Sequence, residues 1–483
     1  MNITYRRIGE HRGAPRLYLD CAALQRAGFC PGATYSLRSD SQALRLTLCL
    51  DPAGSRRVSR KRRGPTLLPV IDINSAGDLA PLGEFGVVRI IILAGAIHVL
   101  LSATACKALA RSARLAARLA LDQPLQTAGI AFGAGIASTA LHEGLAAGGI
   151  RSRLVLANEL CEDYLALAAQ RNTVVLPDTA LVAAPMQELV ADDWLLRRLP
   201  KVDVLEAGIP CSGASRAGAA KRGLARMEDH PTVGHLIGAT IELIAALQPA
   251  IVLIENVVPY RDSASAAILR GWLRDAGYAV HETVLDSSDF GSLEQRVRWF
   301  LVACPVQIGL DLSSLAQATV APTARSSRSA PHLADFLEDI GPDDERFRQV
   351  EYLKEKATRD KDKGSHFAMQ WLRPQSSHVP TLRKGYHKGG STDPRLLHPT
   401  DPARSRLLTG VEHARIKGID SALVAGISDS LAHQVCGQAV DTRPVMAIGR
   451  CLANALVSAR QHLTSAGSQA HWGMSQTATG ATA

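Results

Sequence analysis

One stretch decides the fold of this chain: Asp203-Val204-Leu205-Glu206-Ala207-Gly208-Ile209-Pro210-Cys211-Ser212-Gly213-Ala214-Ser215. Its first half predicts a buried strand that ends at Gly208 and Pro210, and a thiol follows on the turn just beyond. The residues around Cys211 are small, so a bulky, planar molecule can approach the sulfur. A Pro-Cys pair alone is more typical of a turn with a buried thiol, so a reactive cysteine needs support from other segments.

Two further apolar runs carry charged groups at the ends of predicted strands. Residues 251–254 lead into Glu255-Asn256, and Glu294-Gln295-Arg296-Val297-Arg298 leads into the apolar run 299–302. Taken separately, a Glu-Asn pair is typical of a solvated loop, and Arg-x-Arg is typical of a charged strand edge. In this order along one chain, the segments indicate that a thiol, a carboxylate and two guanidinium groups share one site.

These three segments resemble the DNA (cytosine-5) methyltransferase family. The resemblance implies that Cys211 attacks C6 of cytosine, which makes C5 enamine-like and splits one difficult step into easier ones. It implies that Glu255 acts as the acid at N3 of the ring, and that Arg296 and Arg298 orient the pyrimidine and stabilise its charge. Glu294 stands where the family usually has Gln, which leaves open the hydrogen bonds that support the arginines.

Signals for a cofactor lie upstream of the cysteine. Residues 128–136 predict a buried strand that runs into a Gly-rich turn, and residues 153–159 predict a second strand that ends in an acid. An acid at this distance from such a turn suits a ribose diol. The resemblance implies S-adenosyl-L-methionine as the cofactor. Its expected contacts are Phe132, Gly133, Ala134, Gly135, Glu159, Leu160, Gly208, Pro210, Gln438 and Val440.

Several positions depart from the family pattern. The first acid of the family falls on Gly129, its aromatic residue falls on Ala131, and no acid stands at residues 184–186, where an adenine contact is expected. Gln438 and Ala439 replace the usual Asn and Ser. These departures keep one alternative open, a non-catalytic DNA-binding regulator with a degraded cofactor site. A second alternative is methylation of cytosine C5 in RNA.

Double-stranded DNA is the expected partner, because the chain is long and has room for a target-recognition segment. A base inside a duplex cannot present C6 to a thiol, so the cytosine must flip out of the stack. The recognition sequence stays open, and so does the existence of a cognate restriction endonuclease that acts separately. The expected DNA contacts are Ser212, Ser215, Asn256, Arg383 and Lys384.

The composition of the chain predicts its cellular compartment. The chain has 483 residues, of which 46% are apolar, and nine cysteines without a Cys-x-x-Cys pair. These features predict a reduced, cytoplasmic protein without a metal site. The N-terminus is polar and basic, so we expect no signal peptide. Residues 87–101 are apolar, but Arg89 and His98 interrupt them, so they predict a pair of strands instead of a membrane span.

Positive charge gathers at the N-terminus. Residues 1–125 hold 18 Lys and Arg against 8 Asp and Glu, a balance of +10, whereas the whole chain has a net charge of +9. Six of these positive residues lie within residues 56–63. Such a cluster is a candidate for phosphate contact, and a solvated loop is the alternative.

The predicted fold is an α/β class I methyltransferase (Rossmann-like) sheet, mostly parallel, with a small target-recognition region and a small β-rich N-terminal module. The expected segments follow one another along the chain. They are a β-rich basic module (1–105), a helical linker (106–124), a catalytic domain (125–304), a target-recognition region (305–405), a C-terminal segment that returns to the catalytic domain (406–463) and a disordered tail (464–483).

Overall fold

The structure is a computed structural model that describes residues 1–41, 43–83, 86–214, 223–313, 315, 331–362 and 369–474. The chain divides into two compact units. Met1–Ala120 forms most of the smaller unit, and Leu121–Arg274 together with Tyr278–Arg460 forms the larger one.

The smaller unit is rich in strands, as the short apolar runs predict. Its six-stranded sheet has the order β1-β9-β10-β5-β4-β6, and its four-stranded sheet has the order β2-β3-β8-β7. The strands are β1 Asn2–Arg7, β2 Gly9–His11, β3 Ala14–Leu19, β4 Thr34–Asp40, β5 Arg45–Leu50, β6 Arg56–Arg57, β7 Ser59–Arg63, β8 Thr66–Asn74, β9 Val87–Leu93 and β10 Ala96–Leu101. Its helices are α1 Ala22–Arg26, α2 Ala76–Gly83 and α3 Ala103–Ala120.

The apolar segment over residues 87–101 forms two strands. This confirms the prediction of a strand pair, which was made because Arg89 and His98 interrupt the segment. Strands β9 and β10 pair antiparallel, and their side chains alternate between the core and the other face of the sheet, as the two-residue period of a strand requires. Within the described ranges, no helix is long and apolar enough to cross a membrane. In the same ranges, no group of three or more His, Cys, Asp and Glu side chains is arranged to hold a metal ion.

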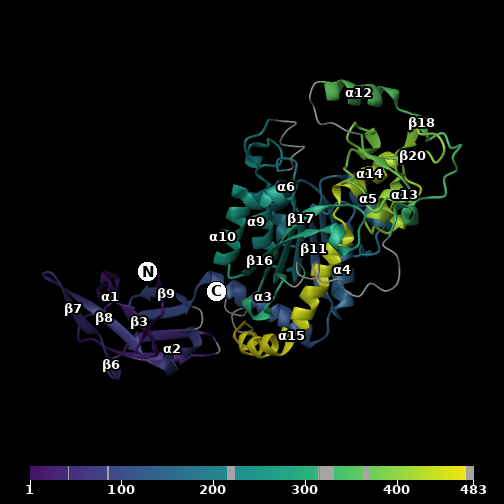
Figure 1. The fold of residues 1–483 in the computed structure, drawn as a ribbon. Coiled ribbons are helices and arrows are strands. Elements are labelled where there is room, and N and C mark those ends of the chain that lie inside the picture. Colours follow the sequence, from purple (N-terminus) through teal and green to yellow (C-terminus); the bar gives the residue numbers. More distant parts are fainter. Residues whose placement is uncertain are drawn as a thin grey trace. The chain divides into compact units, whose positions relative to one another are not determined.

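The larger unit is built on a seven-stranded sheet with the order β13-β12-β11-β14-β15-β17-β16 (Figure 1). Strands β11 to β15 all pair in parallel, and β17 lies antiparallel between β15 and β16. The fold class predicted from the sequence is therefore confirmed. The strands are β11 Leu125–Ile130, β12 Ser152–Glu159, β13 Ala180–Ala183, β14 Val204–Gly208, β15 Ile251–Asn256, β16 Ala279–Asp286 and β17 Val297–Cys304.

Helices connect these strands and, apart from the short α7, bury apolar side chains. They are α4 Ile136–Ala147, α5 Glu162–Arg171, α6 Met186–Ala191, α7 Asp193–Leu196, α9 Leu236–Leu247 and α10 Ala264–Asp275, with short 3-10 helices at η1 Met227–Asp229, η2 Val258–Asp262, η3 Ser287–Phe290 and η4 Val306–Ile308. Because the carboxyl ends of parallel strands meet at one edge, the loops after β11, β12, β14 and β15 all open on the same side.

A small second layer follows β17 in the chain. Its four short strands have the order β18-β21-β20-β19, and Tyr386, Leu396 and Leu408 belong to its buried core. The elements are η5 Leu333–Phe336, β18 Arg348–Gln349, α12 Glu351–Asp362, β19 Trp371–Leu372, η6 Tyr386–Lys388, β20 Arg395–Leu397, β21 Arg404–Arg406, α13 Gly410–Ile416, η7 Ser421–Leu423 and α14 Asp429–Gln438.

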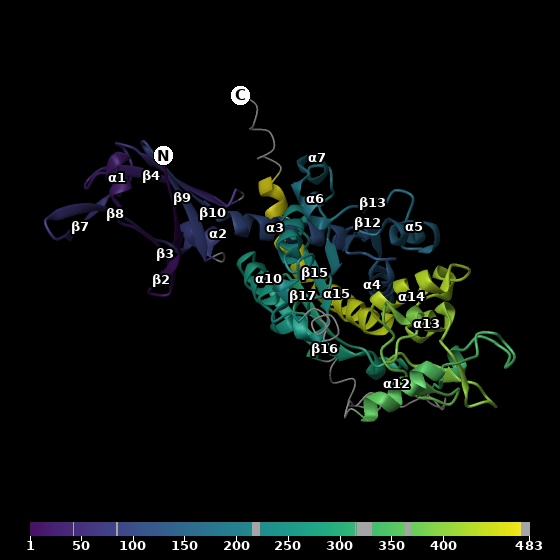
Figure 2. The same ribbon diagram turned by 90° about the horizontal axis from the view of Figure 1, so that it is seen from above.

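The last helix, α15 Thr442–Met474, returns to the sheet and lies alongside α4 (Figures 1 and 2). A Cβ atom on Gly144 of α4 would lie 2.3 Å from the carbonyl oxygen of Met446, so only glycine lets the two helix backbones approach this closely. The helix continues to Met474, whereas the sequence predicted a disordered tail from residue 464. Alanine is common in this stretch and favours a helix. Residues 475–483 lie outside the described residues.

Candidate active site

The predicted nucleophile lies on the loop after strand β14. Cys211 follows Gly208, the last residue of that strand, and its side chain is partly buried. The side chain of Asn256, at the end of β15, donates a hydrogen bond over 3.0 Å to the carbonyl oxygen of Ile209. Asn256 was expected to contact DNA, but it is only 1% exposed. Its amide holds the cysteine loop to the neighbouring strand instead.

A carboxylate and a guanidinium group meet beside this loop. Glu255 Oε1 lies 3.0 Å from Arg298 Nε, and the two side chains are 20% and 16% exposed. Glu255 reaches this place because β15 lies between β14 and β17, with Gly208 opposite Glu255 in the parallel pair. The sheet order therefore brings together residues that lie far apart in the sequence.

The charges of these groups act on the thiol. Burial raises the pKa of Cys211, the charge of Glu255 raises it further, and Arg298 and Arg296 oppose the rise. Burial and the neighbouring Arg296 lower the pKa of Arg298 to about 10. The thiol of the free protein is therefore protonated at neutral pH, and a nucleophilic role for Cys211 requires the loss of this proton.

Arg296 is more deeply buried than Arg298, with 6% of its surface exposed. Its backbone N–H donates to Asp286 Oδ1 over 3.2 Å. Its guanidinium Nη1 lies 3.7 Å from Glu294 Oε1, and Glu294 is fully buried. The support for the arginines, which the sequence left open, comes from a carboxylate in this structure.

The Gly-rich turn after β11 has a backbone that glycine favours. Gly133 and Gly135 have φ angles of 60° and 80°, and Ala131 has a φ of 51°, a conformation that costs energy for a residue with a side chain. The N–H of Gly133 donates to Glu159 Oε2 over 2.7 Å. The turn after β11 is therefore held next to the carboxylate at the end of β12.

This corner can accept a ligand that carries a ribose. Glu159 Oε1 accepts one further hydrogen bond, from the N–H of Cys161 over 3.0 Å. Because a carboxylate offers about four acceptor positions, two remain for a pair of hydroxyl groups. Leu160 beside it is 70% exposed, so an apolar surface is available next to the acid. These residues fit a nucleoside-type ligand.

Some expected cofactor contacts are buried. Phe132 is 4% exposed and packs in a hydrophobic cluster with Leu154 and Leu165. A Cβ atom on Gly129 would lie 2.4 Å from the ring of Phe132, so the ring fills the space where the family has an acid. Ala134 and Val440 are also buried, at 2% and 5% exposure. Gly208 and Pro210 are partly exposed.

Three expected contacts from the C-terminal half bind other protein groups. Lys384 Nζ donates to Gln438 Oε1 over 3.1 Å, so an expected DNA contact and an expected cofactor contact touch each other. Arg383 pairs with Asp393 at 2.6 Å, with 48% of the arginine side chain exposed. Both basic residues keep a surface that could meet a phosphate.

The remaining predicted DNA contacts are Ser212 and Ser215. Ser212 follows Cys211 and is exposed. Ser215 lies outside the described residues. The two serines therefore stay predictions.

Two buried charged residues at the site were missed by the sequence analysis. Glu206, inside β14, is 5% exposed and accepts a hydrogen bond from Ser138 Oγ over 3.1 Å; burial raises its pKa to about 7. The sequence feature that could have revealed Glu206 is an acidic residue within an apolar run. Lys417, just after α13, is fully buried and lies 3.5 Å from Glu294. Nothing in the local sequence indicated that this lysine is buried.

Comparisons with known proteins agree with this geometry. Residues 157–454 match the family described as C-5 cytosine-specific DNA methylase. The type II methyltransferase M.NlaX of Neisseria lactamica is 26% identical over 268 residues, which cover 53% of this chain and 78% of that protein. The type II methylase M.HgiEI of Herpetosiphon aurantiacus is 33% identical over 152 residues, which cover 31% of this chain and 32% of that protein.

A solved structure has the same fold. The crystal structure of the S. pombe Dnmt2 methyltransferase superposes with a TM-score of 0.52 and 17% sequence identity, over 69% of this chain and 99% of that chain. At this identity the likeness concerns the fold alone.

Proposed function

This chain belongs to the C-5 cytosine-specific DNA methylase family and is a DNA cytosine-5 methyltransferase, and we propose that Cys211 is the group that attacks the base. The observation that carries this proposal is the ion pair between Glu255 and Arg298 beside the cysteine loop. Together with Arg296, these residues act on the charge of the thiol. Family membership favours DNA over RNA as the substrate, and a complete set of reactive groups argues against a regulator without catalytic activity.

In the proposed reaction, the flipped cytosine binds next to the loop that carries Cys211. The thiolate of Cys211 forms a bond to C6, which breaks the aromaticity of the ring and moves electron density to C5. Glu255 takes up the proton that the thiol of Cys211 loses and donates it to N3, where negative charge builds, while Arg296 and Arg298 orient the ring. C5 then takes the methyl group and gives its proton to solvent water, the C6–S bond breaks to release the thiolate of Cys211, and N3 returns its proton to Glu255.

We assign S-adenosyl-L-methionine as the methyl donor, because Glu159 has acceptor positions left for a ribose diol beside the Gly-rich turn. When bound, this cofactor supplies a methyl group on a positively charged sulfur. The residues proposed to hold it are Phe132, Gly133, Ala134 and Gly135 through their backbone, with Glu159, Leu160, Gly208, Pro210, Gln438 and Val440.

Bisulfite sequencing tests the proposed function directly. We expect DNA from bacteria that express this chain to carry 5-methylcytosine within one sequence context, which also identifies the recognition sequence. DNA from the same cells with an empty vector is the control. Absence of new 5-methylcytosine, with soluble protein present, contradicts the proposed activity.

Residues 305–405 are the proposed target-recognition region. Strands β18 to β21 form a separate small sheet there, and Arg383 and Lys384 are exposed. The N–H of Gln295 donates to the carbonyl of Val379 over 3.1 Å, so this region is attached directly to the arginine segment. We expect this contact to couple base recognition to base chemistry.

The exposed strand β7 is the proposed phosphate contact of the N-terminal unit. All its residues are exposed, whereas Arg56 and Lys61 of the basic cluster already pair with Asp78 and Asp20. We expect the triple substitution of Arg60, Arg62 and Arg63 by Ala to weaken DNA binding. The slope of log affinity against log salt should flatten by about 0.9 for each phosphate that the variant no longer neutralises. Fluorescence anisotropy at several salt concentrations measures this slope.

The matched control removes Arg6, Arg7 and Arg12, three exposed arginines of the same unit. The control should keep a slope close to that of the wild type. Neither variant should change which cytosines are methylated, because phosphate contacts position a protein without reading bases. If both variants change the slope equally, the net charge of the unit attracts the DNA and β7 has no special role. If the slope of the β7 variant is unchanged, β7 does not contact phosphates and is a solvated hairpin.

The cellular context follows from the substrate. We propose a cytoplasmic enzyme, because bacterial DNA lies in that compartment. The type II names of the bacterial relatives support a role in restriction-modification, with a cognate endonuclease acting as a separate protein. Resistance of DNA from expressing cells to an endonuclease encoded beside the gene tests this role.

A further inference from the structure

A buried ion pair lies behind the arginines of the site. Glu294 Oε2 and Lys417 Nζ are 3.5 Å apart, and both side chains are fully buried. A buried charge is costly unless it is paired and hydrogen-bonded, so this pair needs further partners. Glu294 enters from the segment before β17, and Lys417 enters from the end of α13.

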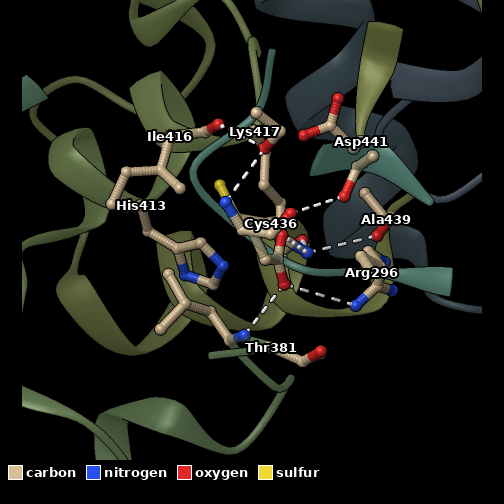
Figure 3. Close-up of polar contacts among 12 residues, drawn as sticks. Arg296, Thr381, His413, Ile416, Lys417, Cys436, Ala439 and Asp441 are labelled. Atoms are coloured by element: carbon tan, nitrogen blue, oxygen red, sulfur yellow. Dashed lines mark hydrogen bonds and ion pairs between the residues drawn. The ribbon is translucent and has the colours of Figure 1, made fainter. Parts of the chain in front are cut away.

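Lys417 uses its other hydrogen bonds on the C-terminal segment. Its ammonium donates to the carbonyl of Cys436 over 2.8 Å and to that of Ala439 over 3.3 Å. Figure 3 shows Lys417 and Arg296 entering the same cluster from different elements. The lysine therefore joins the end of α14 to the arginine segment.

Glu294 makes the matching contacts on the other side. Its Oε1 accepts a hydrogen bond of 2.8 Å from the N–H of Leu382 and lies 3.7 Å from Arg296 Nη1. Residue Leu382 directly precedes the exposed Arg383 and Lys384. One carboxylate thus contacts the lysine, the arginine proposed to orient the base, and the start of the proposed DNA-contacting segment.

We propose that Glu294 and Lys417 act as one pair of positioning residues, which holds Arg296 and the segment 379–384 in place for the flipped cytosine. The inference deepens the proposed function and rests on it. Without Lys417, the negative charge of Glu294 is balanced only by Arg296, which is drawn away from the base. Without Glu294, a positive charge stays buried beside Arg296 and repels it.

A double-substitution cycle tests this coupling. We expect Lys417→Gln to lower kcat about 100-fold and Glu294→Gln about 10-fold, with the affinity for S-adenosyl-L-methionine unchanged. The double variant should recover to within about threefold of the wild type, because two amides replace two charges and can still bond Leu382 and Cys436. Single-turnover methylation, cofactor titration and thermal melting are measured on all four proteins.

A second buried ion pair supplies the matched control. Arg406 and Glu412 lie 2.7 Å apart, are 2% and 0% exposed, and join β21 to the same helix α13. Glu412→Gln should lower the melting temperature but keep kcat near that of the wild type at a temperature where the protein is folded. Equal losses of kcat in Glu412→Gln and Glu294→Gln overturn the positioning role. So does a double variant that is no better than the worse single variant.

The pH profile provides a readout that does not depend on folding. Burial lowers the pKa of Lys417 to about 8, and Arg296 lowers it while Glu294 opposes this. The other charged or titratable groups that face this pair are Arg298, His413, Cys436 and Asp441. We expect kcat of the wild type to fall above about pH 8, as Lys417 loses its charge, and we expect no such fall in the double variant.

The contribution of Lys417 to stability should move in the opposite direction over the same range. The folded-state pKa of Lys417 lies below its unfolded value of 10.5, so between about pH 8 and 10.5 the unfolded state binds more protons. The contribution of this group to stability therefore rises with pH. A fall in activity above pH 8 that the double variant shares contradicts the proposal. If the wild type itself transfers no methyl group, the proposed function fails instead.

Discussion

Cys211→Ser is expected to abolish methylation of DNA. A hydroxyl group is far less ionised than a thiol at neutral pH, so the serine cannot form the bond to C6 of cytosine. Cofactor binding and DNA binding should persist, because Cys211 lies on a loop that Asn256 holds in place. Transfer of labelled methyl groups to DNA measures the loss.

A covalent trap makes this result specific. DNA with 5-fluorocytosine should form a stable adduct with the wild type, because no proton can leave C5 of the base, and no adduct with Cys211→Ser. Cys451→Ser is the matched control, since Cys451 is also a partly buried free cysteine but lies on α15. An adduct on Cys211→Ser, or normal turnover, would assign the chemistry to another residue.

Glu255→Gln is expected to lower the rate of methyl transfer by ~10²–10⁴-fold, the usual value of general acid catalysis. The amide can still lie beside Arg298, whose Nε is 3.0 Å from the carboxylate, but it cannot deliver a proton to N3 of the base. The affinities for DNA and cofactor should change little, because the proton is needed only in the transition state. Single-turnover kinetics measures the chemical step.

A second ion pair of similar exposure controls for structural effects. Glu282 lies 2.7 Å from Arg270, and the arginine and glutamate side chains are 19% and 25% exposed, close to the values for Arg298 and Glu255. Glu282→Gln should therefore keep its rate. If Glu255→Gln has the rate of the wild type, Glu255 only stabilises the end of β15. In that case Glu255 is not the acid that acts with Cys211.

The strand-end positions of the main reactive residues could be predicted from local sequence patterns. Apolar runs that end in Gly, Pro or an acid predict buried parallel strands, and parallel strands bring their carboxyl ends to one edge. Cys211 and Glu255 therefore needed only the order of the strands to meet, whereas Arg298 joins them because it lies at the start of β17, which runs antiparallel beside β15. Glu159 was found in the same way, because its strand follows a Gly-rich turn.

Other roles depended on contacts between distant segments, which no local pattern records. Asn256 was expected at DNA but binds the cysteine loop, because the direction of a side chain at a strand end is set by its neighbours. The ring of Phe132 fills the space left by Gly129, which the order of residues alone could not show. Lys417 and Glu294 lie in separate segments, and only packing buries them together. A charge becomes costly, and therefore informative, only when the tertiary structure removes it from water.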